Sequence, residues 1–163
     1  MGEALGEVSS TLWRERELLE LLQFKLEEEQ LVLAAQRSRW LPHATREVEM
    51  VLEEIKRAEL ARAVEVERVA ELLGLAAAPS LHELIETAPA PWGDILAEHR
   101  KALMAATEEI QSLANANRDL LQAAHRAARE ALAALSEPET TRTYTASGRA
   151  SRPSGPRLVD GAM

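Results

Sequence analysis

The side chains best suited to chemistry in this 163-residue sequence are its histidines and glutamates, because it contains no cysteine. His43 with Glu47, and His82 with Glu86, are each four residues apart, so each pair would share one helix face and offer two metal ligands. Di-iron sites in helical bundles need paired Glu-x-x-His elements that face inward, and the sequence has none. We interpret both pairs as solvated helix faces, and a metal-binding bundle that uses His43 or His82 stays as a third alternative.

Other chemical functions also lack the residues that they require. The sequence has no Gly-rich phosphate loop and no thiol nucleophile, so we expect neither an enzyme nor a cofactor. His99 falls on an apolar seam, where a hydrogen-bonded or partly exposed histidine is expected rather than a metal ligand. A net charge of −8 opposes non-specific binding to nucleic acid, which needs a basic surface.

The N-terminus lacks the basic start and apolar core of a signal peptide. No apolar run approaches the roughly 20 residues that span a bilayer. We therefore expect a cytoplasmic protein without stable membrane insertion.

The elements that carry these residues are predicted to be helices. Nearly all the acid is glutamate, which helix interiors tolerate better than aspartate. The first helix is expected to start at a capping hydroxyl within residues 9–11 and to end around Arg39, because Pro42 disfavours helix just before it. Glu15 and Glu29 interrupt its apolar seam, which repeats every seven residues. The seam consists of Leu12, Leu19, Leu26 and Leu33, with Leu22 on the same face.

Three more helices follow in the prediction. One runs from about His43 to Leu73, with Gly74 as a left-handed stop. A short helix begins at Ser80, where Glu83 completes a capping box. The last runs from Trp92 to Leu135 and contains neither Gly nor Pro after its first turn. The expected apolar stripe of the second long helix is Val48, Leu52, Ile55, Val66, Val69 and Leu73. Glu59 and Arg62 fall in this stripe, where apolar residues would be expected.

These elements predict an all-α fold, an elongated antiparallel bundle of three long helices and one short helix. Residues 1–135 would form the helical-bundle domain. Residues 136–163 are rich in Ser, Thr, Pro, Gly and Arg and cannot bury much apolar surface, so we expect a flexible tail that is disordered alone.

The last helix is longer than the partners available to it. At about 1.5 Å per residue the first two helices span roughly 40–50 Å and the last about 65 Å. By that comparison its packed part ends near Gln122, and Leu132 and Leu135 have no segment to cover them. Asn117 lies on its seam, where a polar residue either fixes helix register or hydrogen-bonds a partner.

The sequence resembles the FlgN family of flagellar type III export chaperones over about residues 10–150. The resemblance lies in the Leu/Glu style of Leu18–Leu22 and Glu27–Leu31, the Arg-to-Leu-Gly turn of Arg68–Leu75, the asparagine–leucine segment Asn115–Leu121, and the tyrosine–glycine element Thr143–Gly148.

The resemblance implies a chaperone that binds hook–filament junction (hook-associated) proteins by their C-terminal helical region. Such a chaperone prevents premature assembly and delivers its cargo to the type III export gate, and we expect a monomer when free. Tyr144 and Gly148 would contact the cytoplasmic domain of the export gate. The expected cargo-binding residues are Leu113, Asn117, Leu120, Leu121, Ala124, Ala128, Leu132 and Leu135. The alternative is a coiled-coil scaffold or adaptor that self-associates and has no chaperone activity.

Overall fold

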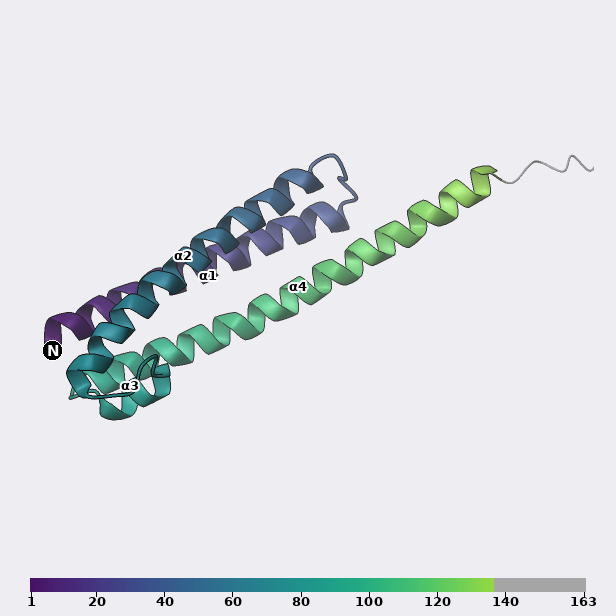
Figure 1. The fold of residues 1–163 in the computed structure, drawn as a ribbon. Coiled ribbons are helices and arrows are strands. Elements are labelled where there is room, and N and C mark those ends of the chain that lie inside the picture. Colours follow the sequence, from purple (N-terminus) through teal and green to yellow (C-terminus); the bar gives the residue numbers. More distant parts are fainter. Residues whose placement is uncertain (137–163) are drawn as a thin grey trace, which may run out of the picture. The chain divides into compact units, whose positions relative to one another are not determined.

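A computed structural model describes residues 1–136 of the chain, and this part contains helices and no strands (Figure 1). The helices are α1 (Gly2–Ala34), α2 (Leu41–Leu73), α3 (Leu81–Thr87) and α4 (Trp92–Ser136). The prediction of an all-α helical bundle is confirmed. The predicted gate residues Tyr144 and Gly148 lie outside the described residues.

The chain divides into two compact units, residues 1–126 and residues 127–163. The first unit holds α1, α2, α3 and most of α4. Of the second unit the structure describes residues 127–136, which form the last turns of α4 and have exposed side chains.

Helix α1 begins at Gly2, so the predicted start within residues 9–11 is wrong. Leu5 and Val8, in the two turns before Ser9, are completely buried in the core. Burial of these apolar side chains holds the extra turns in helical form, which outweighs the capping preference of the hydroxyl residues. The hydroxyl of Ser9 instead reaches His99 of α4, and Thr11 donates to the main-chain oxygen of Val8.

Helix α1 also ends earlier than expected, at Ala34 rather than around Arg39. Gln36 adopts a left-handed conformation with φ 54°, which breaks the helical path before Pro42 exerts any effect. The connection to α2 therefore starts one turn earlier than the proline predicts.

Helix α2 keeps the predicted extent, and Gly74 ends it with φ 70° in the left-handed region. The stripe is wrong at Leu52, which is 41% exposed, because Val51 occupies the core in its place. Val51 lies three residues after Val48 and four before Ile55, so the alternating spacing of a heptad seam is kept.

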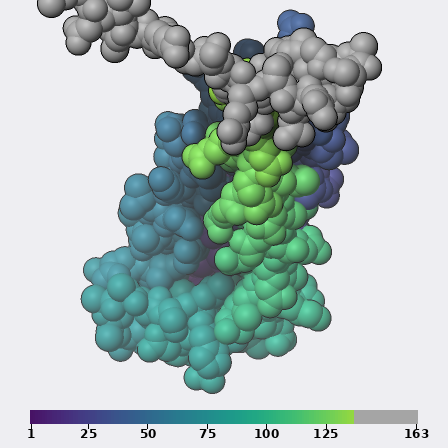
Figure 2. Space-filling view, turned by 90° about the vertical axis from the view of Figure 1, so that its right-hand side faces the viewer, coloured from purple at the N-terminus to yellow at the C-terminus, as the bar shows by residue number. Residues whose placement is uncertain are grey.

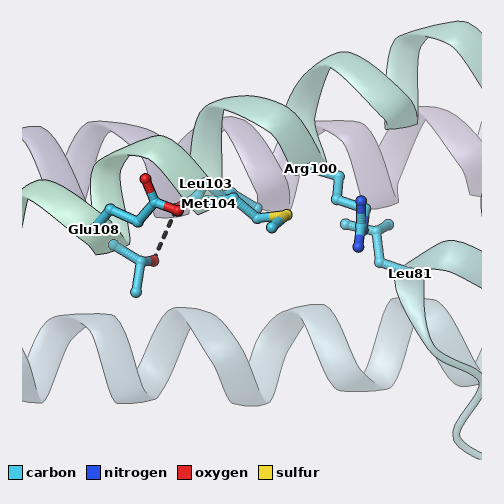
Figure 3. Close-up of a pocket in the computed structure, with 6 residues that line it drawn as sticks. Leu81, Arg100, Leu103, Met104 and Glu108 are labelled. Atoms are coloured by element: carbon cyan, nitrogen blue, oxygen red, sulfur yellow. Dashed lines mark hydrogen bonds between the residues drawn. The ribbon is translucent and has the colours of Figure 1, made fainter.

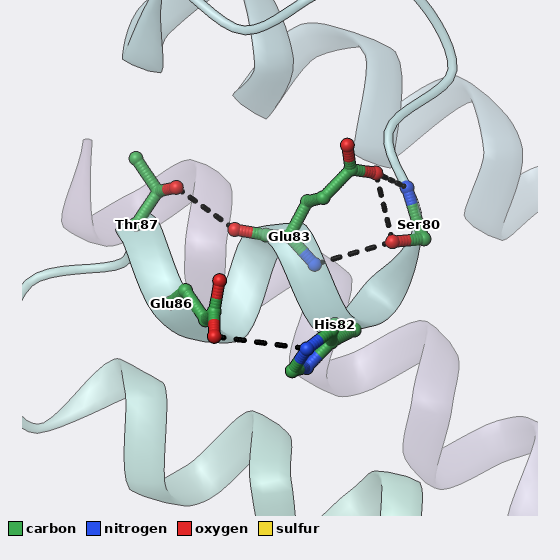
Figure 4. A network of polar contacts seen from close by, with 5 residues as sticks. All are labelled: Ser80, His82, Glu83, Glu86 and Thr87. Carbon is green, nitrogen blue, oxygen red and sulfur yellow. Dashed lines mark hydrogen bonds and ion pairs between the residues drawn. The ribbon is translucent and has the colours of Figure 1, made fainter.

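Helix α3 is short and begins with the predicted capping box (Figure 4). The Ser80 hydroxyl accepts from the Glu83 main-chain N–H at 3.2 Å, and the Glu83 carboxylate accepts from the Ser80 main-chain N–H at 2.7 Å. The Ser80 main-chain N–H and the Ser80 hydroxyl, which donates to the same Glu83 oxygen at 2.8 Å, lower the pKa of the Glu83 carboxyl below its ordinary value. The box gives the seven-residue helix a defined start.

Two apolar clusters hold the first unit together. One joins the start of α1 and the end of α2 to α3 and the start of α4, and Leu84 and Leu96 are completely buried in it. The other lies nearer the α1–α2 connection and consists of Leu22, Leu26, Val48 and Val51, with Ile55, Ile110 and Leu113 packed against them.

Within the first unit, α4 runs in the same direction as α1 and opposite to α2 (Figure 1). Figure 2 shows the opposite directions of α2, coloured blue to teal, and α4, coloured teal to green. Successive cross-contacts from α1 to α4 show this direction. They join Ser9 to His99, Gln23 to Glu109 and the main chain of Leu26 to Asn117. Helix α4 thus lies alongside α1 from His99 to Asn117.

Candidate partner-binding site on α4

A polar junction links all three long helices near the α1–α2 connection. The Asn117 side-chain amide on α4 donates to the main-chain oxygen of Leu26 at 2.9 Å and to the Glu29 carboxylate at 3.0 Å. The Thr45 hydroxyl on α2 donates to the other Glu29 oxygen at 2.8 Å. Glu29, which interrupts the apolar seam of the sequence, therefore accepts one hydrogen bond from each neighbouring helix.

A groove of about 270 Å³ lies next to this junction. Its apolar lining comes from all three long helices, and four leucines supply most of it. The lining residues are Leu26, Glu29, Leu33, Leu41, Thr45, Ala114, Asn117, Arg118 and Leu121. The groove therefore joins an apolar surface to the polar junction.

The predicted cargo residues of α4 fall into two groups. Leu113 and Leu120 are half-buried, and Asn117 is buried with 5% of its surface exposed. Leu113 packs against the apolar cluster near the α1–α2 connection. These three side chains face the bundle, and the Asn117 nitrogen has the register-fixing contacts expected of a polar seam residue.

The other predicted residues face solvent. Leu121 is 39% exposed, Leu132 65% and Leu135 83%, and the side chains of Ala124 and Ala128 are exposed as well. Leu121, Ala128 and Leu135 are seven residues apart, and Ala124 and Leu132 lie within a turn of them, so all five share one side of the helix. We call these five residues the α4 stripe. A helix with an uncovered apolar side is suited to pairing with another amphipathic helix.

Sequence reasoning missed the α1 and α2 residues that line the groove. The signal for Glu29 was present, because a carboxylate in an otherwise apolar seam needs a partner when the seam packs. Nothing marked Leu41 or Thr45, since their role depends on how α2 returns along α1.

A second groove, of about 310 Å³, lies between the start of α3 and α4 (Figure 3). Leu81, Leu103 and Met104 supply its apolar walls, and Arg100 and Glu108 also line it. Met104 is 50% exposed there, so the groove is open to solvent.

The histidines show no metal-binding arrangement within residues 1–136, where no group of three possible ligands occurs. His82 and Glu86 lie 3.6 Å apart as an exposed pair (Figure 4). His99 is 2% exposed, shares a hydrogen bond of 3.0 Å with Ser9, and forms a T-shaped contact with the Trp13 ring. Burial lowers the pKa of the His99 imidazole below its ordinary value, and the nearby charge of Arg16 lowers it further.

The fold is that of an all-α helical-bundle protein. Residues 1–152 match the family described as FlgN protein, so the chain belongs to the FlgN family. This membership gives it the general role of a flagellar export chaperone and implies binding of flagellar hook-associated proteins. Neither a curated protein nor a solved structure matches the chain. In the described part of the chain, no helix is both long and apolar enough to cross a bilayer.

Proposed function

We propose that this protein works in the cytoplasm, where it holds the C-terminal helical region of a hook-associated protein against the α4 stripe. Holding that region prevents premature assembly, and the complex is delivered to the type III export gate. The protein acts without catalysis and is a monomer when free.

The observation that carries this proposal is the change in exposure along α4. Side chains up to Leu120 are at least partly covered at the seam positions, whereas from Leu121 to Ser136 every side chain is exposed. The exposed part still presents large apolar residues, Leu132 and Leu135. Alanines between the leucines let a second helix approach closely, so the stripe suits an amphipathic helix of the cargo.

The decisive experiment measures binding of a hook-associated protein by titration calorimetry. Replacing Leu132 and Leu135 with serine should weaken binding by about tenfold or more, because exposed leucines buried by a partner act as anchors. The matched control replaces Leu31 and Leu60, each 70% exposed but outside α4, with serine and should bind as the parent does. Removing residues after Gln122 should abolish binding, and unchanged binding by that truncation would refute the assignment of the site.

The gate contact is proposed for Tyr144 and Gly148, which lie outside the described residues. Tyr144→Ala should leave cargo affinity unchanged and lower the amount of cargo exported. Thr143→Ala is the control for a change in the same segment. Loss of cargo affinity in Tyr144→Ala would instead assign that residue to the cargo site.

The alternative function is a coiled-coil scaffold that self-associates. The same exposed α4 stripe favours it, because two copies could cover each other's leucines. Sedimentation of the free protein over a hundredfold concentration range separates the two functions. The chaperone should stay monomeric, whereas a scaffold should form oligomers that dissociate in the Leu132→Ser, Leu135→Ser double variant.

A further inference from the structure

The nitrogen of the Asn117 side-chain amide is hydrogen-bonded, whereas its oxygen has no hydrogen-bond donor in the described part of the chain. Its nitrogen donates to the main-chain oxygen of Leu26 and to Glu29. Both partners are acceptors, so they fix which end of the amide is nitrogen and which is oxygen. The oxygen, Oδ1, is buried and receives no hydrogen bond from any donor in residues 1–136.

A buried acceptor without a donor is costly, because it has given up water and gained nothing in return. A ligand that brings a donor to Oδ1 recovers that cost on binding. Asn117 also lines the groove beside the junction, so the unpaired acceptor belongs to a side chain at the edge of an apolar surface. An orphaned acceptor and an apolar groove at one place are two independent features that both fit a bound partner.

We infer that this groove is a subsite for the cargo helix, which inserts one large apolar side chain between the leucines and donates one hydrogen bond to Asn117 Oδ1. The inference rests on the proposed function, since its occupant is the same hook-associated protein. Leu121 connects the two surfaces, because it lines the groove and is also the first residue of the α4 stripe.

The chemistry of the site narrows the donor to a neutral polar side chain. Main-chain N–H groups inside a helix are already bonded within that helix, so they cannot serve. A lysine or arginine would bring a charge into a partly apolar groove that Arg118 already lines. The charges of Glu29 and Arg118, which both line the groove, already balance, so a further cation would leave the groove with a net positive charge. Serine, threonine, asparagine or glutamine fits these limits.

A donor can reach the buried Oδ1 only if side chains at the rim of the groove move. Arg118 is exposed and Leu121 is 39% exposed, so neither side chain is held by the core. Leu26, by contrast, is 6% exposed and forms the fixed floor. A partner can therefore displace the rim without unpacking the bundle.

The test measures binding of the full-length chain to a hook-associated protein by calorimetry. Ala114→Leu fills the groove and should weaken binding about tenfold or more. Ala105→Leu, the same change at an exposed α4 position outside the groove, is the control and should bind as the parent does. Equal affinity of the Ala114→Leu variant and the parent would overturn the inference.

A second measurement identifies the hydrogen bond itself. Each Ser, Thr, Asn and Gln in the cargo's helical region is replaced by alanine and titrated against the parent and against Asn117→Leu. One replacement should cost about tenfold with the parent and nothing with Asn117→Leu. Equal costs with both chains, for every replacement, would show that Oδ1 takes no part.

The outcomes separate this inference from the proposed function. If Ala114→Leu binds normally while the truncation after Gln122 loses binding, the groove subsite is wrong and the chaperone site stands. If the parent chain binds no hook-associated protein, the proposed function fails and the subsite with it. Thermal unfolding of Asn117→Leu checks whether this variant keeps its fold. If Asn117→Leu does not fold, the binding measured with Ala114→Leu alone tests the groove subsite.

Discussion

Arg62 of α2 donates its side-chain N–H to Glu15 of α1 across a distance of 2.7 Å. The Glu15 side chain is 7% exposed and that of Arg62 is 31% exposed, so the pair is largely removed from water. Both residues stand at seam positions where an apolar side chain is expected. Glu15 and Arg62 each interrupt an apolar seam, and they lie 47 residues apart in the sequence. In the structure the two side chains pair with each other, and this contact sets how α1 and α2 align.

The alignment role of this pair predicts a strong coupling between the two residues. Glu15→Leu alone should destabilise the protein by about 1–3 kcal/mol, less than a fully buried pair would lose because Arg62 reaches solvent. The double variant with Arg62→Leu should be more stable than the sum of the two single changes predicts, because two leucines restore an apolar seam. Urea unfolding of the four proteins measures the coupling, and additive effects would show that the pair does not act as a unit.

The sequence predicts those helix ends that depend on residues close to them in the chain. Gly74, Ser80 and Glu83 act within a few residues of themselves, so the end of α2 and the start of α3 are correctly predicted. The start of α1 depends on burial of Leu5 against elements more than 60 residues away. No pattern of neighbouring residues indicates that contact, and the hydroxyl residues at 9–11 predict a later start for α1.

The candidate site likewise has one part that the sequence predicts and one part that depends on long-range contacts. The exposed leucines of the α4 stripe follow from the length of α4 compared with α1 and α2, which the sequence supplies. The groove beside Asn117 depends on which residues of α1 and α2 lie opposite one another, and that register depends on long-range contacts such as Thr45 with Glu29. Helix periodicity predicts faces, whereas a groove between three helices requires their alignment.

His99 should make stability depend on pH. Its pKa is lowered in the folded protein from 6.5 by burial and by Arg16, while Glu98 acts in the opposite direction. The unfolded chain therefore binds more protons than the folded one as the pH falls below 6.5, so stability is complete above that pH and declines toward the lower folded-state pKa. Thermal unfolding between pH 7.5 and pH 5 should show this decline in the parent and a smaller one in His99→Gln. His125→Gln, at an exposed position on α4, should behave like the parent, and identical slopes in all three proteins would exclude His99 as the cause.

Alanine substitutions at Gly74 and Gly2 can be compared to measure the effect of backbone conformation on stability without the effect of steric clashes. A Cβ added at either position meets no atom within 4 Å, so neither substitution creates a clash. Gly74 has φ 70°, and alanine there should cost about 1–2 kcal/mol, the penalty of a left-handed conformation for a residue with a Cβ. Gly2 lies at the start of α1, where alanine should stabilise slightly through its better helix propensity. Denaturant unfolding should show the two changes with opposite signs, and a destabilisation of equal size at both positions would contradict this explanation.

Thr45 tests whether the polar junction fixes the three long helices in place. Thr45→Val keeps the shape of the side chain and removes the hydroxyl that donates to Glu29 at 2.8 Å. The lost hydrogen bond to a carboxylate should cost on the order of 1–2 kcal/mol of unfolding free energy. Thr11→Val is the control, because the Thr11 hydroxyl bonds only to Val8 of its own helix and its loss should change stability little. Hydrogen exchange should also rise at the amides around Asn117 in Thr45→Val, since Glu29, which accepts from Asn117, then loses one of the two hydrogen bonds that orient its carboxylate. Unchanged exchange at Asn117 together with unchanged stability would mean that the Asn117 contacts hold α4 in register without help from α2.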